Sequence, residues 1–317
     1  MQFRNLGNSG LRVSVVGLGG NNMGGRLNQA ESSAVVHKAL DYGVTFFDSA
    51  DAYGKRGGGK TGDSEICLGE ALGARRKDIV LATKFGHAMD AAGKLKGASR
   101  RYILSAVEAS LKRLKTDWID LYQLHSPDPL TPIEETMRAM DDLVRQGKVR
   151  YIGCSNTPAW LFVQAQWTAR GANGAQFITC QDEYSLVNRN IEKELVPAAN
   201  AHGASFLPFY PLASGLLTGK YRPDAPPPPG SRFAKPERYE SRFINDRTTN
   251  KVEALRAFAE ARGHTLLELA MSWLACQPHV GSIIAGATSP SQVESNVAAA
   301  SWTLTADELA EIDRITK

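Results

Sequence analysis

The stretch IDLYQLHSPDPLTPIEETMRAMDDLVRQGKVRYIG, which covers residues 119–153, decides the fold class of this 317-residue chain. Residues 119–125 form a short apolar run typical of a buried strand, and residues 133–145 repeat apolar side chains at helical spacing. Residues 149–153 form a second strand-like run. A strand, a helix and another strand in this order predict a β–α–β unit with two parallel strands.

The same alternation continues on both sides of this unit. Further strands are expected at 13–18, 44–48, 79–83, 177–180, 205–208 and 280–285, and helices at 30–42, 64–72, 101–114, 159–170 and 306–315. About eight strand-to-helix steps favour an α/β fold of the (β/α)8 TIM-barrel type, as a single domain over residues 1–317. An open doubly wound sheet is the competing arrangement. It would normally carry Gly-x-Gly-x-x-Gly after the first strand, whereas residues 17–22 read GLGGNN.

Composition and charge argue against several classes of protein. The 37 Lys and Arg residues outnumber the 33 Asp and Glu residues by only four and form no basic run, so nucleic acid is not an expected partner. The sequence has no apolar stretch of about 18 residues and no apolar signal-peptide core, so we expect a cytoplasmic protein without membrane contact. The four cysteines form no CxxC pair and match no zinc spacing, which predicts reduced thiols.

Two segments interrupt the regular alternation. Residues 54–62 are rich in Gly and Lys and are expected to form a flexible loop. Residues 222–245 contain four consecutive prolines and are too long for an ordinary connection. They follow the seventh strand at the barrel face where active sites lie, so we expect them to cover a bound ligand. A plain surface excursion is the alternative.

Four polar residues stand at or just after the ends of successive strands. Asp48 ends the second strand and Tyr53 follows it, Lys84 ends the third strand, and His125 ends the fourth. In a barrel these side chains converge on one pocket. Together they suit a site in which Tyr53 donates a proton. An ammonium beside Tyr53 would lower its pKa, and Asp48 would neutralise a buried Lys84. His125 would hydrogen-bond the substrate oxygen.

A metal site at the same mouth is a weaker hypothesis. Asp48, Asp51, His125 and Glu183 supply oxygen and nitrogen atoms, but Lys84 among them would repel a cation. We therefore predict no metal.

Seven segments, in order, resemble the aldo-keto reductase superfamily. They are FDSADAYG at 47–54, ATKFG at 82–86, DLYQLH at 120–125, IGCSN at 152–156, QDEYSL at 181–186, PLASGLLTGK at 211–220, and GATSPSQ at 286–292 with Asn296. The resemblance covers essentially the whole chain. It is to the bacterial branch with a long loop after strand seven, similar to potassium-channel β-subunit-like reductases.

The resemblance implies a barrel with an N-terminal β-hairpin and a nicotinamide cofactor. It implies an enzyme that transfers hydride reversibly between this cofactor and an aldehyde, ketone or sugar-like carbonyl. Tyr53 would be the general acid/base, with Asp48, Lys84 and His125 completing a catalytic tetrad. A catalytically weak, cofactor-sensing regulatory subunit on the same fold is the alternative function, and a metal-dependent barrel hydrolase is a second one. The oligomeric state is not indicated.

The resemblance also implies where the cofactor binds. Phe209 matches the position of a stacking tyrosine, and Tyr210 replaces a small serine. Some members carry cations where Gly286 and Gln292 stand, yet Lys220 and Arg232 can compensate, so NADPH is favoured and NADH is possible. The expected contacts are Gly20, Asn21, Asp48, Ser155, Asn156, Gln181, Phe209, Tyr210, Pro211, Leu212, Ser214, Gly215, Leu216, Lys220, Arg232, Gly286, Thr288, Ser289, Gln292 and Asn296.

Overall fold

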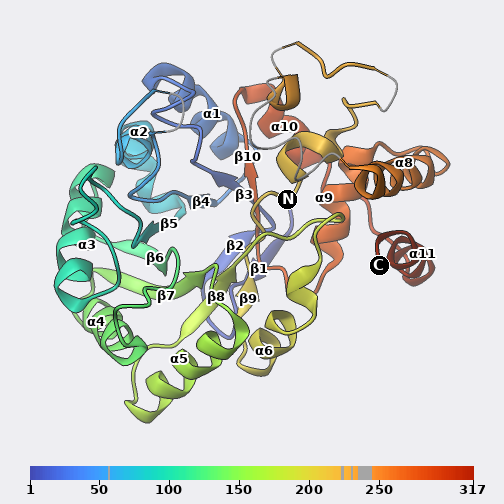
Figure 1. Cartoon of the computed structure of the whole chain (residues 1–317). Coiled ribbons are helices and arrows are strands. Elements are labelled where there is room, and N and C mark those ends of the chain that lie inside the picture. The colour runs from blue at the N-terminus through green and yellow to red at the C-terminus, as the bar shows by residue number, and fades with distance from the viewer. Residues whose placement is uncertain (56–57, 223–224, 230, 235–244) are drawn as a thin grey trace.

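Eight parallel strands form the centre of the structure, a computed structural model that describes residues 1–55, 58–222, 225–229, 231–234 and 245–317. The strand order is β10-β3-β4-β5-β6-β7-β8-β9 (Figure 1). The strands are β3 (Val16–Gly19), β4 (Phe46–Asp48), β5 (Val80–Phe85), β6 (Ile119–Leu124), β7 (Val149–Ser155), β8 (Phe177–Gln181), β9 (Ser205–Phe206) and β10 (Ile283–Gly286).

The sheet closes on itself between β9 and the segment that leads into β10. Phe206 N donates to His279 O at 2.7 Å, Gly281 N donates to Phe206 O at 2.8 Å, and Ile284 N donates to Pro208 O at 2.9 Å. This parallel pairing joins the two ends of the strand order, so the predicted (β/α)8 barrel is confirmed.

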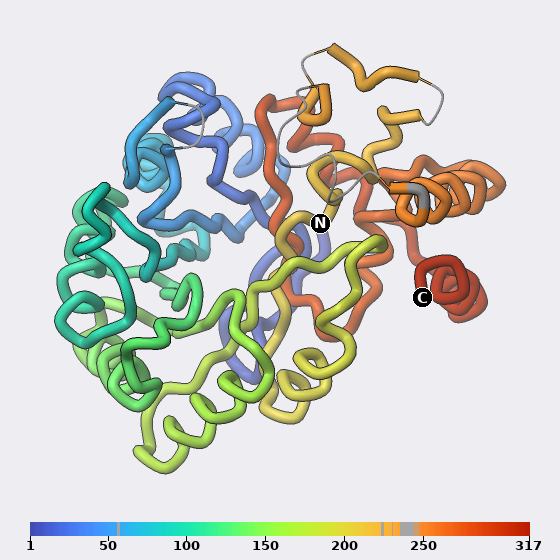
Figure 2. The backbone as a smooth tube through the Cα atoms, viewed as in Figure 1, coloured from blue at the N-terminus to red at the C-terminus, as the bar shows by residue number. Residues whose placement is uncertain are grey.

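Helices surround the barrel, as the tube in Figure 2 shows. Helix α4 has the range predicted from the sequence, because its apolar positions repeat cleanly and Pro132 precedes its first turn. The helices are α1 (Gln29–Asp41), α2 (Asp63–Leu72), α3 (Arg100–Leu114), α4 (Ile133–Arg145), α5 (Ala159–Gly171), α6 (Leu195–Ala201), α8 (Asp246–Glu260), α9 (Leu266–Cys276), α10 (Pro290–Ala298) and α11 (Ala306–Thr316). Short 3₁₀ turns are η1 (Gly73–Asp78), η2 (Asn190–Glu192), η3 (Ala213–Thr218) and η4 (Arg232–Ala234).

The predicted first strand, residues 13–18, is two elements in the structure. Strand β2 (Arg12–Ser14) pairs with β1 (Phe3–Asn5) in an antiparallel N-terminal hairpin, and only β3 enters the barrel. The chain changes partner at Val15, whose N–H bonds to Gln2 O at 2.9 Å. Because residues 13–18 form an almost continuous apolar run, the sequence does not indicate where the chain changes its pairing partner.

The barrel interior is built in layers, because alternate side chains of a strand point to the same face. Phe46, Ala82 and Leu121 form an apolar layer with Leu207, Ile284 and two hairpin residues, Leu6 and Val13. Two residues further along the same strands stand Asp48, Lys84 and Gln123. The interior is therefore apolar at the end covered by the hairpin and polar at the carboxyl ends of the strands.

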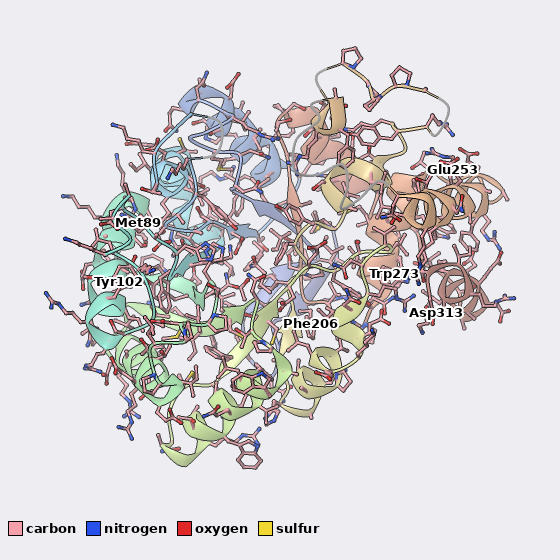
Figure 3. All side chains as sticks on the ribbon, viewed as in Figure 1. Met89, Tyr102, Phe206, Glu253, Trp273 and Asp313 are labelled. Atoms are coloured by element: carbon pink, nitrogen blue, oxygen red, sulfur yellow. The ribbon has the colours of Figure 1, made fainter. Side chains whose placement is uncertain are left out.

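A larger apolar core lies between the sheet and the helices. Trp273 of α9 and Phe206 of β9, both labelled in Figure 3, are fully buried. Within the described residues, no helix is long and apolar enough to span a bilayer. Residues 223–224, 230 and 235–244 of the expected ligand-covering segment 222–245 lie outside the described residues.

Candidate active site

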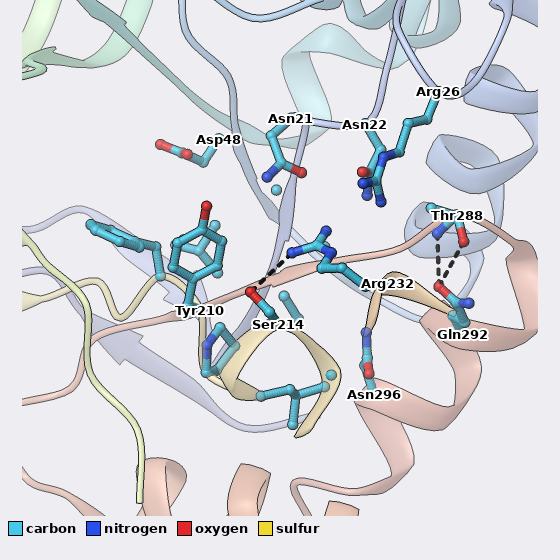
Figure 4. A pocket seen from close by; sticks show the side chains of 18 of the residues that line it. Asn21, Asn22, Arg26, Asp48, Tyr210, Ser214, Arg232, Thr288, Gln292 and Asn296 are labelled. Atoms are coloured by element: carbon cyan, nitrogen blue, oxygen red, sulfur yellow. Dashed lines mark hydrogen bonds between the residues drawn. The ribbon is translucent and has the colours of Figure 1, made fainter. Parts of the chain in front are cut away.

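A cavity of about 730 Å³ opens at the carboxyl ends of the barrel strands (Figure 4). Its walls include Gly19, Asp48, Ser155, Gln181 and Gly286, each of which is the last residue of its strand. The inward-facing residues of the strands are apolar at the hairpin end of the barrel and polar at this end. The cavity brings together most of the site residues predicted from the sequence.

Asp48, Lys84 and Tyr53 form a connected group at the floor of the cavity. Lys84 Nζ lies 2.5 Å from Asp48 Oδ2, 2.8 Å from Ser49 O and 3.5 Å from Tyr53 Oη. Lys84 and Asp48 are 0% and 2% exposed at their side chains, so they form a buried ion pair. Tyr53 faces the cavity, while Lys84 lies behind it and does not line the cavity itself.

Two glutamines hold the second oxygen of Asp48. Gln123 Nε2 and Gln181 Nε2 both donate to Asp48 Oδ1, at 3.0 and 2.9 Å. The carboxylate is therefore fixed at both oxygens, which keeps the Lys84 ammonium in one position. Gln123 belongs to the motif at 120–125, but the sequence assigned it no role, although strand alternation places it on the inward face two residues before His125.

The pKa of Tyr53 departs from the sequence expectation. Burial raises it above the ordinary tyrosine value, and the Lys84 ammonium lowers it by less than burial raises it. Asp48 adds to the increase because its negative charge opposes formation of the phenolate. The pKa of Lys84 is also raised: burial lowers it, but Asp48 and Tyr53 together outweigh burial. Lys84 thus acts on the pKa of Tyr53 in the expected direction, and burial outweighs it.

His125 packs against Tyr53 on one side and His87 on the other. The Tyr53 and His125 ring centroids are 5.6 Å apart in an edge-on arrangement. The His87 and His125 rings are stacked at 3.8 Å with an interplanar angle of 9°. His87 lines the cavity but was missed from the sequence, because it follows the strand-end motif ATKFG as a lone loop histidine.

Ser155, Asn156 and Gln181 form a polar wall beside these residues. Asn156 takes a left-handed backbone conformation with φ of 52°, and its Nδ2 donates to His125 O and Ser155 Oγ at 3.0 and 2.9 Å. Gln181 Nε2 donates to Asp48 and Gln123. Both amides use their N–H groups within the protein, so each would meet a ligand through its carbonyl oxygen. This donor and acceptor set fits a carboxamide.

The turn η3 and two cations beside it, Lys220 and Arg232, form another wall of the cavity. Ser214 and Gly215 have φ values of 61° and 101°, which break the helical path inside the turn. Arg232 Nη1 donates to Ser214 Oγ at 3.1 Å, and Lys220 Nζ would lie 3.4 Å from a Cβ added at Gly215. Two cations beside a backbone turn of this kind fit the phosphates of a dinucleotide.

Phe209 and Tyr210 both line the cavity, together with Pro211 and Leu212. Their rings are 5.3 Å apart and nearly perpendicular. Tyr210 has a φ of 52° and projects into the cavity (Figure 4). It contributes to the raised pKa of Tyr53, so the two phenols share one electrostatic environment. Sequence comparison with the family pointed to Phe209 for stacking, and the structure adds a second ring.

The far end of the cavity is formed by β10, α10 and the loop after β3. Gly286, Thr288, Gln292 and Asn296 line it with Asn21. Gln292 Oε1 accepts from Thr288 N at 2.8 Å (Figure 4). Asn22 and Leu267 also line the cavity and were not predicted, and Thr218 of the predicted segment 211–220 lines it as well. Arg26 and Ser295 line it too, although the sequence assigned them no contact with the cofactor.

Three predicted contacts lie outside the cavity lining. Gly20 N donates to Asp48 O at 2.7 Å, and a Cβ there would lie 2.9 Å from Ser64 Oγ, so Gly20 permits the close approach of α2. Leu216 is 6% exposed and belongs to the apolar core. Ser289 accepts a hydrogen bond from Gln292 N as the N-cap of α10. Over the described residues there is no cluster of His, Cys, Asp or Glu suited to a metal ion.

A family model and several relatives match this chain over nearly its whole length. The model of the aldo/keto reductase family matches residues 15–317. A probable voltage-gated potassium channel subunit beta of Arabidopsis thaliana is 39% identical over 307 residues, which cover 94% of this chain and 91% of that protein. Aldo-keto reductase YhdN of Bacillus subtilis (strain 168) is 34% identical over 328 residues, 99% of this chain and 93% of that protein.

A third relative has a substrate in its name. L-glyceraldehyde 3-phosphate reductase of Escherichia coli (strain K12) is 33% identical over 326 residues, which cover 99% of this chain and 92% of that protein. With the family match over nearly the whole length and the closed barrel, this likeness shows that the chain belongs to the aldo/keto reductase family of oxidoreductases.

Proposed function

We propose that this protein reduces a small-molecule aldehyde, ketone or sugar-like carbonyl with NADPH, reversibly, and that Tyr53 is its general acid/base. The observation that carries the proposal is the chain of contacts from Asp48 through Lys84 to Tyr53 at the cavity floor. It joins a proton donor open to the cavity with a buried cation fixed by a carboxylate. NADH is a possible substitute for NADPH.

The proton transfer follows from these contacts. In the reducing direction, Tyr53 gives its proton to the carbonyl oxygen as the adjacent carbon accepts hydride, and the product is an alcohol. The phenolate that remains is stabilised by Lys84 Nζ at 3.5 Å, and Asp48 keeps that ammonium in place. His125 borders the same space and would hydrogen-bond the substrate oxygen. In the oxidising direction the phenolate takes the proton back.

The cavity walls fit a nicotinamide dinucleotide, which supplies the hydride when bound. Ser155, Asn156 and Gln181 would hold the carboxamide, and an aromatic ring at Phe209 or Tyr210 would stack on the nicotinamide ring. Lys220, Arg232 and the η3 backbone would hold the pyrophosphate. These groups follow one another along a single cavity.

The test is the variant Tyr53→Phe, which removes the proton and keeps the ring. We expect carbonyl-dependent NADPH oxidation to fall by at least about 10²-fold, because general acid assistance is worth about 10²–10⁴-fold. Fluorescence titration should give an NADPH Kd within a few-fold of the wild type. Turnover equal to that of the wild type would exclude the assigned role.

A second candidate is a catalytically weak subunit that senses the cofactor and regulates a partner. It is favoured by the potassium channel β subunit among the relatives. The two functions separate in one assay of NADPH oxidation with a panel of aldehydes, ketones and sugars. Tight NADPH binding without consumption for any carbonyl would support the regulatory function over the enzymatic one.

A further inference from the structure

The loop between β3 and α1, residues 20–28, forms a wall of the cavity and contains an unassigned cation. Arg26 lines the cavity together with Asn22. Met23 and Leu27 on either side of Arg26 are 2% and 5% exposed, and Leu27 N donates to Asn22 O at 2.9 Å. Arg26 therefore projects from a backbone that is fixed by buried neighbours.

The Arg26 guanidinium is available to a ligand. Its side chain is exposed, and within the part of the chain that the structure describes it makes no hydrogen bond or ion pair. In Figure 4 it reaches from this loop toward Asn22. Asn22 Nδ2 donates to Ala287 O at 3.1 Å, which ties the loop to the segment carrying Thr288 and Gln292. Arg26 is thus held at the far end of the cavity.

Two other cations line the cavity at a different part of its wall from Arg26. Arg232 and Lys220 lie against the turn η3, at Ser214 and Gly215. This turn is the part of the wall where a pyrophosphate would lie, because backbone turns of this kind hold phosphates. The carboxylate on the wall, Asp48, is already paired with Lys84. Arg26 is a third cation and lies on a different wall. If the pyrophosphate were the only anionic group of the ligand, Arg26 would therefore have no negative charge to neutralise.

We infer that Arg26 binds the 2′-phosphate of NADPH and gives this protein its preference for NADPH over NADH. This inference rests on the proposed function. A phosphate monoester carries about 1.5–2 negative charges at neutral pH, and a guanidinium binds it through paired N–H donors. Gly286 and Gln292, on β10 and α10, offer no cation. Arg26 supplies it from the loop before α1 instead.

The test compares wild type with Arg26→Gln, titrated by fluorescence with NADPH and NADH and by competition with 2′,5′-ADP and 5′-ADP. Loss of one charge-assisted phosphate contact should weaken NADPH and 2′,5′-ADP about 10- to 100-fold. The Kd values for NADH and 5′-ADP should change less than about three-fold. Arg101→Gln is the matched control, because Arg101 is an exposed arginine outside the cavity lining whose loss changes the net charge equally.

Two results would overturn the inference. Equal weakening of NADPH and NADH would place Arg26 at the pyrophosphate, and an unchanged preference would place it outside the cofactor site. Both leave the proposed function intact. Failure of the proposed function has a different signature: wild-type protein would then bind neither dinucleotide, or bind NADPH without oxidising it for any carbonyl, whatever residue stands at position 26.

Discussion

At the scale of single residues, Tyr53 is subject to two opposing influences. Burial and the nearby Asp48 raise its pKa, and Lys84 at 3.5 Å lowers it. Burial prevails because Lys84 shares its charge with Asp48 at 2.5 Å, so the phenol sees a nearly neutral pair. A phenol with a raised pKa keeps its proton at neutral pH. That protonation state is the one an acid needs before it meets a carbonyl.

Asp182 gives a pH prediction at the same scale. Burial raises its pKa to about 8, and its Oδ2 has no hydrogen-bond partner among the described residues. Between about pH 4 and pH 8 the folded protein therefore holds a proton that the unfolded chain has lost, so stability falls as pH rises. For Asp182→Asn, the free energy of unfolding should gain at least about 1 kcal/mol over wild type between pH 5 and pH 8. Urea unfolding at several pH values measures this difference.

The control for this prediction is Asp117→Asn, because Asp117 is exposed before β6. Its difference from wild type should stay nearly constant over the same range. A constant difference for Asp182→Asn as well would contradict the assignment of the proton to Asp182.

At the scale of elements, the pairing of β7 with β8 brings two backbones close together inside the barrel. Gly153 lies opposite Thr179, and a Cβ added at Gly153 would lie 2.2 Å from Thr179 Oγ1 and 3.3 Å from Gln123 Cγ. Ser155 and Gln181, the next inward residues of these strands, line the cavity. The absence of a side chain at Gly153 therefore sets the spacing of the strands that end in the polar wall.

Gly153→Ala is expected to destabilise the protein by about 1–3 kcal/mol, because the added methyl group overpacks the interior. Thr179→Ala removes Oγ1, which is buried and has no hydrogen-bond partner in the described part of the chain. The double variant should therefore be more stable than the sum of the two single effects predicts. Urea unfolding of the four proteins measures this coupling, and additive effects would show that the two residues do not meet.

At the scale of the whole molecule, the two ends of the barrel differ: one is an apolar layer that contributes to stability, and the other holds the candidate active site. The hairpin closes one end with Leu6 and Val13, and the cavity opens at the other. Leu6→Ala should cost about 2–5 kcal/mol of unfolding free energy, because Leu6 is fully buried. The NADPH Kd of the folded variant should stay within about two-fold of wild type. Leu130→Ala, at a position 88% exposed, is the matched control and should change neither quantity.

Much of this architecture follows from local patterns. Residues 133–145 fold as the predicted helix, since apolar periodicity and the preceding proline agree on its limits. Residues 13–18 do not form one strand, because the pattern of apolar residues is the same whether the chain pairs with β1 or enters the barrel. The family motifs led to Asp48, Lys84 and Tyr53, whose close contact the structure shows.

The sequence by itself determined the alternation of strands and helices, the barrel class and the polar residues at the strand ends, because each of these is set by neighbours in the chain. Only the tertiary structure decided what those residues meet. It placed His87 on His125, Gln123 on Asp48, and Arg26 in the same cavity as Lys220 and Arg232. It also buried Tyr53, which raises the pKa of the phenol by more than Lys84 lowers it. Burial and charge pairing depend on segments far apart in sequence, so no local pattern records them.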